Sequence, residues 1–163
     1  MSEIKLTRVD DRLIHAQILL LWVKTTNINT IVLVDDEVAN NPFLAEIYRL
    51  AMPTHIRLHV KTVEEAITYD YSSEPELWHD RRTLVLMKTL DTAYRLLDAG
   101  FPIESLQIGG SVVEQETDRK KLLDILLSQY PRQLSYLISA NVTIYCQKSP
   151  QTQKVYVNKA HAS

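Results

Sequence analysis

The sequence has little cysteine, no large excess of positive or negative charge and no long hydrophobic run. One cysteine, Cys146, cannot form an internal disulfide or supply a multi-thiolate metal site. Eighteen Lys and Arg against 20 Asp and Glu give a net charge of −2, which excludes a generally basic nucleic-acid binder. The longest apolar run, residues 18–23, is far shorter than the ~18 residues of a membrane span. The N-terminus lacks a signal-peptide pattern, so we expect a cytoplasmic protein with no nucleic-acid partner.

Glycine is also scarce, and its scarcity excludes a class of site. The only three glycines are Gly100, Gly109 and Gly110, so the glycine-rich phosphate loops of nucleotide-binding proteins are absent. There is no HExxH motif, and His55 and His59 flank a strand-like segment with no third ligand nearby. We therefore predict neither a metal ion nor another cofactor.

Strand-like and helix-like patterns alternate along most of the 163 residues, which suffice for one domain, 1–163. Short apolar runs are typical of strands buried in a parallel sheet. They predict strands at 4–9, 30–34, 56–60, 83–87, 105–108 and 142–146, with helices between most of them. This alternation predicts an α/β fold: a three-layer α/β/α sandwich with an open, mostly parallel central sheet.

Local signals place several helix ends. Asn41 is the expected cap of a helix that Pro42 opens, Thr62 begins the next helix, and Gly100 ends a later one. The last third is ambiguous. Residues 118–129 have helical periodicity although 125–128 also suit a strand, Pro131 suits the first turn of another helix, and 154–157 could be a last strand or a loose tail.

The strongest chemical candidate is R-V-D-D-R-L-I-H, residues 8–15, which runs from the first strand into a helix. Neutral imidazole is a competent nucleophile, so His15 is a candidate phosphoryl acceptor. Arg12 can neutralise a transferring phosphoryl group, and Asp10 or Asp11 can hold the imidazole tautomer. The free N–H groups of the following helix would add donors. The structural alternative is a histidine at a helix start among solvated charges. The pattern also leaves open whether Arg8 contacts phosphate or faces solvent.

A second candidate is the pair Asp35 and Asp36 after the second strand. Adjacent acids there can bind magnesium, as in aspartate-phosphorylated receiver domains. No Asp ends the third strand to act as the acceptor, and the pair could simply turn the chain toward Pro42.

Two further strand ends could contribute to a phosphate site. Lys88 and Thr89 follow the fourth strand and offer a cation and a hydroxyl, although Thr89 is favoured as a helix cap. Gly109 and Gly110 follow the fifth strand and permit close approach of the backbone to a ligand or to the first loop.

Four motifs carry a family resemblance: R-V-D-D-R-L-I-H-A-Q (8–17) followed by Trp22, V-L-V-D-D-E-V-A-N-N-P (32–42), L-V-L-M-K-T (84–89) and L-Q-I-G-G (106–110). They resemble the IIB subunit of the mannose/fructose/sorbose class of the bacterial phosphoenolpyruvate-dependent sugar phosphotransferase system. The likeness covers about the first 110 residues.

The resemblance implies a phosphoryl-carrier transferase with a three-layer α/β/α fold. The histidine matching His15 would receive a phosphoryl group on its δ nitrogen from the IIA subunit and pass it to sugar entering through the IIC and IID membrane subunits. Asp10 and Arg12 would belong to the same active loop, with support from Asp11, Ala16 and Gln17. The protein would be cytoplasmic and peripherally associated with the membrane permease. Whether it forms a homodimer is open.

Several positions depart from the family pattern. Ala16 stands where the family usually has glycine, and S-V-V-E-Q-E-T-D follows Gly110 in place of a glycine-containing turn. Family members often have a strand near 125–128, which favours a strand there. These departures allow a second class of function, a non-catalytic regulatory or binding module on the same fold. Phosphorylation of His15 by an upstream donor discriminates the two.

Overall fold

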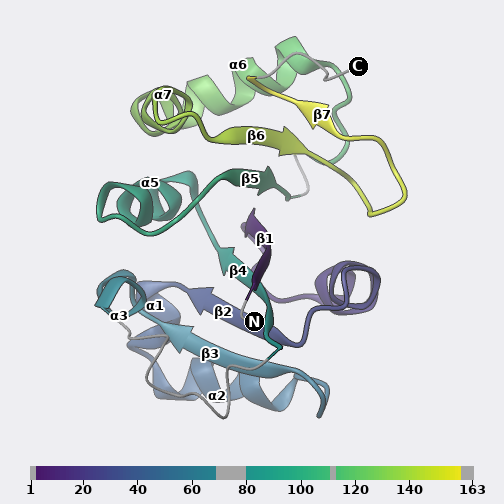
Figure 1. Ribbon diagram of the computed structural model, residues 1–163, viewed down its shortest axis with the longest axis vertical. Coiled ribbons are helices and arrows are strands. Elements are labelled where there is room, and N and C mark those ends of the chain that lie inside the picture. The colour runs from purple at the N-terminus through teal and green to yellow at the C-terminus, as the bar shows by residue number, and fades with distance from the viewer. Residues whose placement is uncertain (1–2, 69–79, 111–112, 159–163) are drawn as a thin grey trace.

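A seven-stranded sheet runs through the middle of the molecule in the order β3-β2-β4-β1-β5-β6-β7 (Figure 1). The structure is a computed structural model that describes residues 3–68, 80–110 and 113–158. The strands are β1 (Glu3–Val9), β2 (Thr30–Val34), β3 (Arg57–Lys61), β4 (Arg82–Met87), β5 (Ser105–Ile108), β6 (Thr143–Cys146) and β7 (Val155–Tyr156). All neighbouring strands pair in parallel except β6 and β7, which are antiparallel. The predicted open, mostly parallel sheet is confirmed.

Helices pack on both faces of this sheet. They are η1 (Ile18–Val23), α1 (Asp36–Ala39), α2 (Pro42–Leu50), α3 (Val63–Thr68), α5 (Leu90–Asp98), α6 (Arg119–Gln129) and α7 (Pro131–Ser139). One buried cluster joins η1, α1 and α2 to one face, and a second joins α3, α5, α6 and α7 to the other. The three-layer arrangement is therefore confirmed. Among the described residues, no helix is both long and apolar enough to span a bilayer.

The predicted helix ends are observed. The side chain of Asn41 accepts a hydrogen bond from Leu44 N at 3.1 Å, with Pro42 in the first turn of α2. Thr62 and Glu65 form a capping box: Glu65 N donates to Thr62 Oγ1 at 3.1 Å and Thr62 N donates to Glu65 Oε2 at 2.8 Å. Gly100, which follows α5, has a φ of 92°.

One sequence expectation is wrong. Residues 125–128, favoured as a strand, lie within α6. Asp118 caps this helix by accepting from Lys121 N at 3.1 Å, and Leu122 and Leu126, four residues apart, are both buried in the core. The helical periodicity of 118–129 was the better guide than the family likeness, because it decides which side chains reach the core. Residues 70–82 are polar and only weakly patterned in the sequence, which leaves room for one short helix there; residues 70–79 of this stretch lie outside the described residues.

β1 occupies the position that matters for a ligand site. It lies between β4 and β5. The crossover from β1 to β2 runs toward one side of the sheet, whereas the crossover from its neighbour β4 to β5 runs toward the other side. In open α/β sheets, ligands bind at the carboxyl ends of the strands at such a switch point. Cys146 on β6 is buried, and burial raises the pKa of its thiol to about 12, as suits a core residue.

Candidate active site

A short loop carries the chain from the end of β1 into the helix that contains η1. Asp10 N donates to Met87 O at 2.9 Å, which fastens the loop to β4, and Leu13 N donates to Asp10 O at 3.0 Å. Leu13 has a φ of 55°, a conformation that non-glycine residues rarely adopt. Burial of Leu13 and Ile14 holds this turn in place, and helical residues begin at Ala16. His15 therefore lies on a fixed turn directly before a helix.

Asp10 is the centre of the site. Its side chain is fully buried and accepts two hydrogen bonds from the Arg12 side chain, Nε to Oδ1 and Nη2 to Oδ2, both at 2.9 Å. Arg8 Nη2 donates to Oδ2 at 2.9 Å, and His15 Nε2 lies 3.1 Å from the same oxygen. Burial opposes ionisation of this carboxyl, but the hydrogen bonds from Arg12 and the charge of Arg8 outweigh it and hold the pKa of Asp10 well below its ordinary range.

The state of Asp10 fixes the state of His15. An ionised carboxylate can only accept hydrogen bonds, so the ring nitrogen facing it, Nε2, must carry a proton. In the neutral imidazole the other nitrogen, Nδ1, then has the free lone pair. The side chain of His15 is 18% exposed, so its ring is partly accessible from solvent. This geometry presents Nδ1 as a nucleophile.

Arg8 lies beneath this pair and is fully buried. It donates to Gln107, its register partner on β5, and its guanidinium carbon is 5.3 Å from the centre of the Trp22 ring. A Cβ atom on Gly109 would lie 2.0 Å from Arg8 Nη2, so only glycine leaves room for this guanidinium. The expected close approach to the first loop is observed at Gly110, where a Cβ atom would lie 2.7 Å from Asp11 Oδ1. Arg8 does not face solvent.

Glu114 completes the charged cluster. Its Oε1 accepts from Arg8 Nη2 at 2.6 Å, from Arg12 Nη2 at 2.8 Å and from Gly110 N at 3.3 Å. The Glu114 side chain is 8% exposed. Two guanidinium groups and the carboxylates of Asp10 and Glu114 therefore meet beside His15, with their charges balanced.

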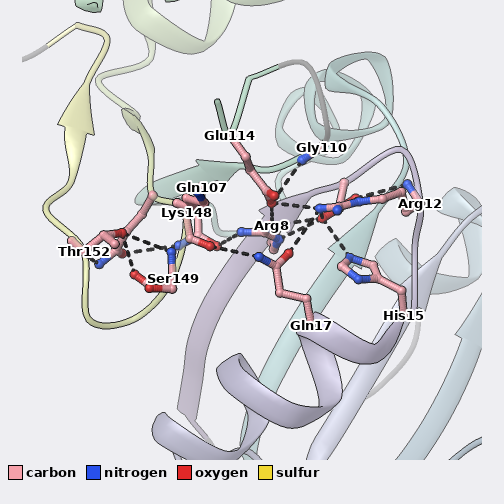
Figure 2. Close-up of polar contacts among 12 residues, drawn as sticks. Arg8, Arg12, His15, Gln17, Gln107, Gly110, Glu114, Lys148, Ser149 and Thr152 are labelled. Atoms are coloured by element: carbon pink, nitrogen blue, oxygen red, sulfur yellow. Dashed lines mark hydrogen bonds and ion pairs between the residues drawn. The ribbon is translucent and has the colours of Figure 1, made fainter. Parts of the chain in front are cut away.

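Of the supporting residues, Gln17 joins the cluster. Its Oε1 accepts from Arg12 Nη2 at 3.2 Å, and its Nε2 donates to Lys148 O at 3.0 Å. Gln17 thereby links the arginine to the loop between β6 and β7, as Figure 2 shows. Ala16 is exposed at the helix start, and Asp11 is exposed at the rim of the site.

Lys88 and Thr89 lie elsewhere. Together with Asp11 and Gly110 they line a neighbouring cavity of about 150 Å³. Thr89 caps α5 by accepting from Thr92 N, and Lys88 Nζ lies 3.7 Å from a carboxylate oxygen of Glu37. The preferred interpretation of Thr89 as a helix cap is confirmed.

Asp35 and Asp36 are also occupied by structural contacts. Asp35 accepts from Val38 N at 2.9 Å and begins α1, and Asp36 accepts from Val63 N at 2.8 Å and pairs with Arg95 at 2.9 Å. Within the described ranges, no group of three or more His, Cys, Asp or Glu side chains could hold a metal ion.

Sequence reasoning missed Gln107 and Glu114 and left Arg8 open. A glutamine within the otherwise apolar strand L-Q-I was a signal, because an uncharged polar residue buried in a sheet needs a partner. Glu114 gave none, since only the fold brings residue 114 to the end of β1.

The domain is a three-layer α/β sandwich in which a buried carboxylate orients a histidine after the central strand. Comparisons with known proteins identify the family of this domain. The family model described as PTS system sorbose subfamily IIB component matches residues 4–158, and the chain belongs to this family. The match extends well beyond the 110 residues of the sequence resemblance.

Individual relatives agree. The chain is 33% identical to the PTS system mannose-specific EIIAB component of Escherichia coli K12 over 112 residues, which cover 69% of the chain and 34% of that relative. It is 25% identical to N-acetylgalactosamine-specific phosphotransferase enzyme IIB component 1 of the same strain, over 93% of the chain and 94% of that protein. The crystal structure of the sorbose permease IIB domain from Klebsiella pneumoniae has the same fold, with a TM-score of 0.72 at 21% identity, covering 96% of this chain and 94% of that one. The chain spans about a third of the length of the mannose-specific EIIAB relative.

Proposed function

We propose that this chain is a phosphoryl carrier of a sugar phosphotransferase system. His15 takes a phosphoryl group from a IIA subunit and passes it to a sugar during uptake through IIC and IID membrane subunits. Membership in the sorbose-type IIB family supports the general role. The observation that carries the assignment to His15 is the contact of its Nε2 with the buried Asp10, which directs the lone pair to Nδ1.

The first transfer uses this lone pair. Nδ1 of His15 attacks the phosphorus of the phosphoryl group carried by IIA, a new N–P bond forms, and the bond between phosphorus and the donor atom of IIA breaks with its electron pair returning to that donor atom. The His15 ring becomes cationic, and the carboxylate of Asp10 stabilises it through the Nε2 proton. The positive guanidinium of Arg12 stabilises the negative charge that spreads over the phosphoryl oxygens during transfer.

The second transfer reverses the roles. A sugar hydroxyl oxygen attacks phosphorus, the N–P bond breaks, and the electron pair returns to Nδ1 while the hydroxyl proton passes to a base at the sugar site. Both transfers need an accessible ring, and His15 is partly exposed beyond the carboxyl end of the central strand β1. Specific contacts with sugar belong to the membrane subunits in this proposal, and the relatives' names include mannose, sorbose, fructose and N-acetylgalactosamine.

The proposal also covers the domain organisation of the chain and its localisation in the cell. Residues 1–163 form one IIB domain that works in the cytoplasm, peripherally bound to its permease. The family match over residues 4–158 and the single seven-stranded sheet support one domain.

Intact-mass spectrometry tests the proposal. The chain is incubated with phosphoenolpyruvate, enzyme I, the histidine phosphocarrier and a IIA subunit, beside the variants His15→Ala and His55→Ala. His55 is an exposed histidine far along the chain and serves as the matched control. We expect one acid-labile phosphoryl group on the wild type and on His55→Ala, and none on His15→Ala. An unmodified wild type facing a demonstrably phosphorylated cognate IIA would instead support the regulatory module.

A further inference from the structure

One carboxylate oxygen of Glu114 lies where three hydrogen-bond donors meet. Arg8 Nη2, Arg12 Nη2 and Gly110 N all donate to Oε1, at 2.6, 2.8 and 3.3 Å. Two charged donors and a backbone N–H around one oxygen are the arrangement that binds a phosphate or sulfate oxygen. Glu114 therefore fills an anion site with a side chain of the protein itself (Figure 2).

The cluster has no excess positive charge that could bind another anion. Arg8 and Arg12 are matched by Asp10 and Glu114. A phosphoryl group brings a charge of about −1.5 to −2 near neutral pH. A third anion beside two carboxylates would be repelled unless one of them withdrew.

The two carboxylates differ in their freedom to withdraw. Asp10 is fully buried and also holds the backbone N–H of Arg12 at 3.1 Å and the ring of His15. Glu114 lies outside the strands and lines a cavity of about 280 Å³ together with Gln147 and Thr152, so its side chain has space to withdraw without moving a strand. Glu114 is the carboxylate that can be exchanged.

We propose that Glu114 is an exchangeable anion that holds the phosphoryl site in the unmodified chain. When a phosphoryl group or another tetrahedral oxyanion arrives, its oxygens take the donors on Arg12 and Gly110, and the Glu114 side chain turns outward. The transfer part of this inference rests on the proposed function of His15, whereas the binding of a free oxyanion does not.

Glu114 is then a positioning residue that acts through Arg12. It keeps the guanidinium aligned while the site is empty, and it competes with the incoming phosphoryl group. Competition weakens the hold on a phosphoryl group and so favours its onward transfer. Removing the charge while keeping the shape, as in Glu114→Gln, should strengthen oxyanion binding.

The first test titrates inorganic phosphate into the purified chain and follows the Gly110 amide and the Arg12 Nε–H by NMR. We expect Glu114→Gln to bind phosphate about tenfold more tightly than the wild type, a difference of about 1.4 kcal/mol. Glu114→Asp, which keeps the charge, should stay near the wild type. Glu116→Gln is the matched control, because Glu116 accepts only from the backbone N–H groups of Thr117 and Asp118 in the contacts described.

Three results would overturn the exchange: equal binding by Glu114→Gln and the wild type, weaker binding by Glu114→Gln, or no saturable binding by any variant. Thermal unfolding of each variant accompanies the titration. A purely structural role predicts that Glu114→Gln loses stability and binding together.

The second test measures the phosphorylated fraction at equilibrium with phosphorylated IIA. Glu114→Gln should shift that equilibrium about tenfold toward the phosphorylated chain, by the same competition. The two proposals fail separately. If no variant accepts a phosphoryl group but the phosphate titration shows the expected difference, the carrier function falls and the anion exchange stands. If the chain is phosphorylated on His15 but the titration shows no difference, the exchange falls alone.

Discussion

The tripeptide Val-Asp-Asp occurs twice at the end of a buried strand, and its two copies have different fates. Val9-Asp10-Asp11 ends β1, and there the first aspartate holds two guanidinium groups and an imidazole. Val34-Asp35-Asp36 ends β2, and there the first aspartate holds only a backbone N–H of α1 among its described contacts.

The difference arises from the surroundings of each copy. The chain after Asp35 enters a helix at once, so its carboxylate accepts a hydrogen bond from a backbone N–H of that helix. The chain after Asp10 makes a turn that allows the Arg12 side chain to fold back, and Arg8 and β5 add polar groups from beside it. A pair of acids after a strand is therefore not a site by itself. Whether such a pair forms a site depends on the length of the loop that follows and on the polar residues of the neighbouring strand.

The largest expected contrast is between Asp10→Asn and Asp35→Asn. Asp10→Asn leaves two guanidinium groups short of a carboxylate, and breaking a buried ion pair in this way costs about 3–5 kcal/mol. Asparagine caps a helix as well as aspartate does, so Asp35→Asn should change the free energy of unfolding by less than about 0.5 kcal/mol. Urea unfolding at neutral pH measures both. Equal losses would remove the distinction between the two copies.

Acid reaches the same carboxylate without a substitution. The folded-state pKa of Asp10 lies below its ordinary value, so Asp10 contributes its stability above pH ~4 and loses it as the pH falls through the folded-state pKa. As the pH is lowered from 5, the free energy of unfolding of the wild type should decrease, and that of Arg12→Gln should decrease less steeply. Removing Arg12 takes away the hydrogen bonds that lower the pKa of Asp10. Parallel curves for the two proteins would contradict this origin of acid sensitivity.

A smaller effect is expected from Gly109→Ala. The new methyl group meets the end of Arg8, which Asp10, Gln107 and Glu114 hold in place, and overpacking of this kind costs about 1–3 kcal/mol. The displaced guanidinium should also slow phosphorylation of His15. Gly100→Ala is the control, because its cost comes from its φ of 92° alone and it should leave phosphorylation unchanged. A Gly109→Ala variant with full transfer activity would show that Arg8 need not keep this position.

The smallest effect is expected from Ala16→Gly, which introduces the residue that the family resemblance leads us to expect at this position. Ala16 is exposed at the first helical position and makes none of the described side-chain contacts of the cluster. Glycine should reduce stability by no more than about 1 kcal/mol through its greater backbone freedom, and the rate of phosphorylation should stay within twofold of wild type. A large gain in rate would mean that Ala16 restricts the phosphoryl site.

The sequence predicted most of the fold, because buried parallel strands and helix caps depend on local residues such as Asn41, Thr62 and Thr89. The prediction failed at residues 125–128, where the family likeness favoured a strand although the helical periodicity of 118–129, which buries Leu122 and Leu126, pointed to a helix. The acidic and basic residues of the first loop were predictable because they are adjacent in the chain.

The other half of the site was not predictable. Arg8 is buried because Gly109, a hundred residues later in the chain, leaves room for it. Gln107 and Glu114 reach Arg8 only through the pairing of β1 with β5. Such contacts depend on strand order, which the sequence pattern did not give.

The central claim is that Asp10 holds the Nε2 proton of His15 and leaves Nδ1 to react. Long-range ¹H–¹⁵N NMR of the chain labelled in its histidines, before and after phosphorylation by IIA, tests it most directly. The account predicts an Nε2–H tautomer in the free chain and a phosphoryl group bonded to Nδ1 of His15 afterwards. An Nδ1–H tautomer in the free chain, or a phosphoryl group on Nε2, would contradict it.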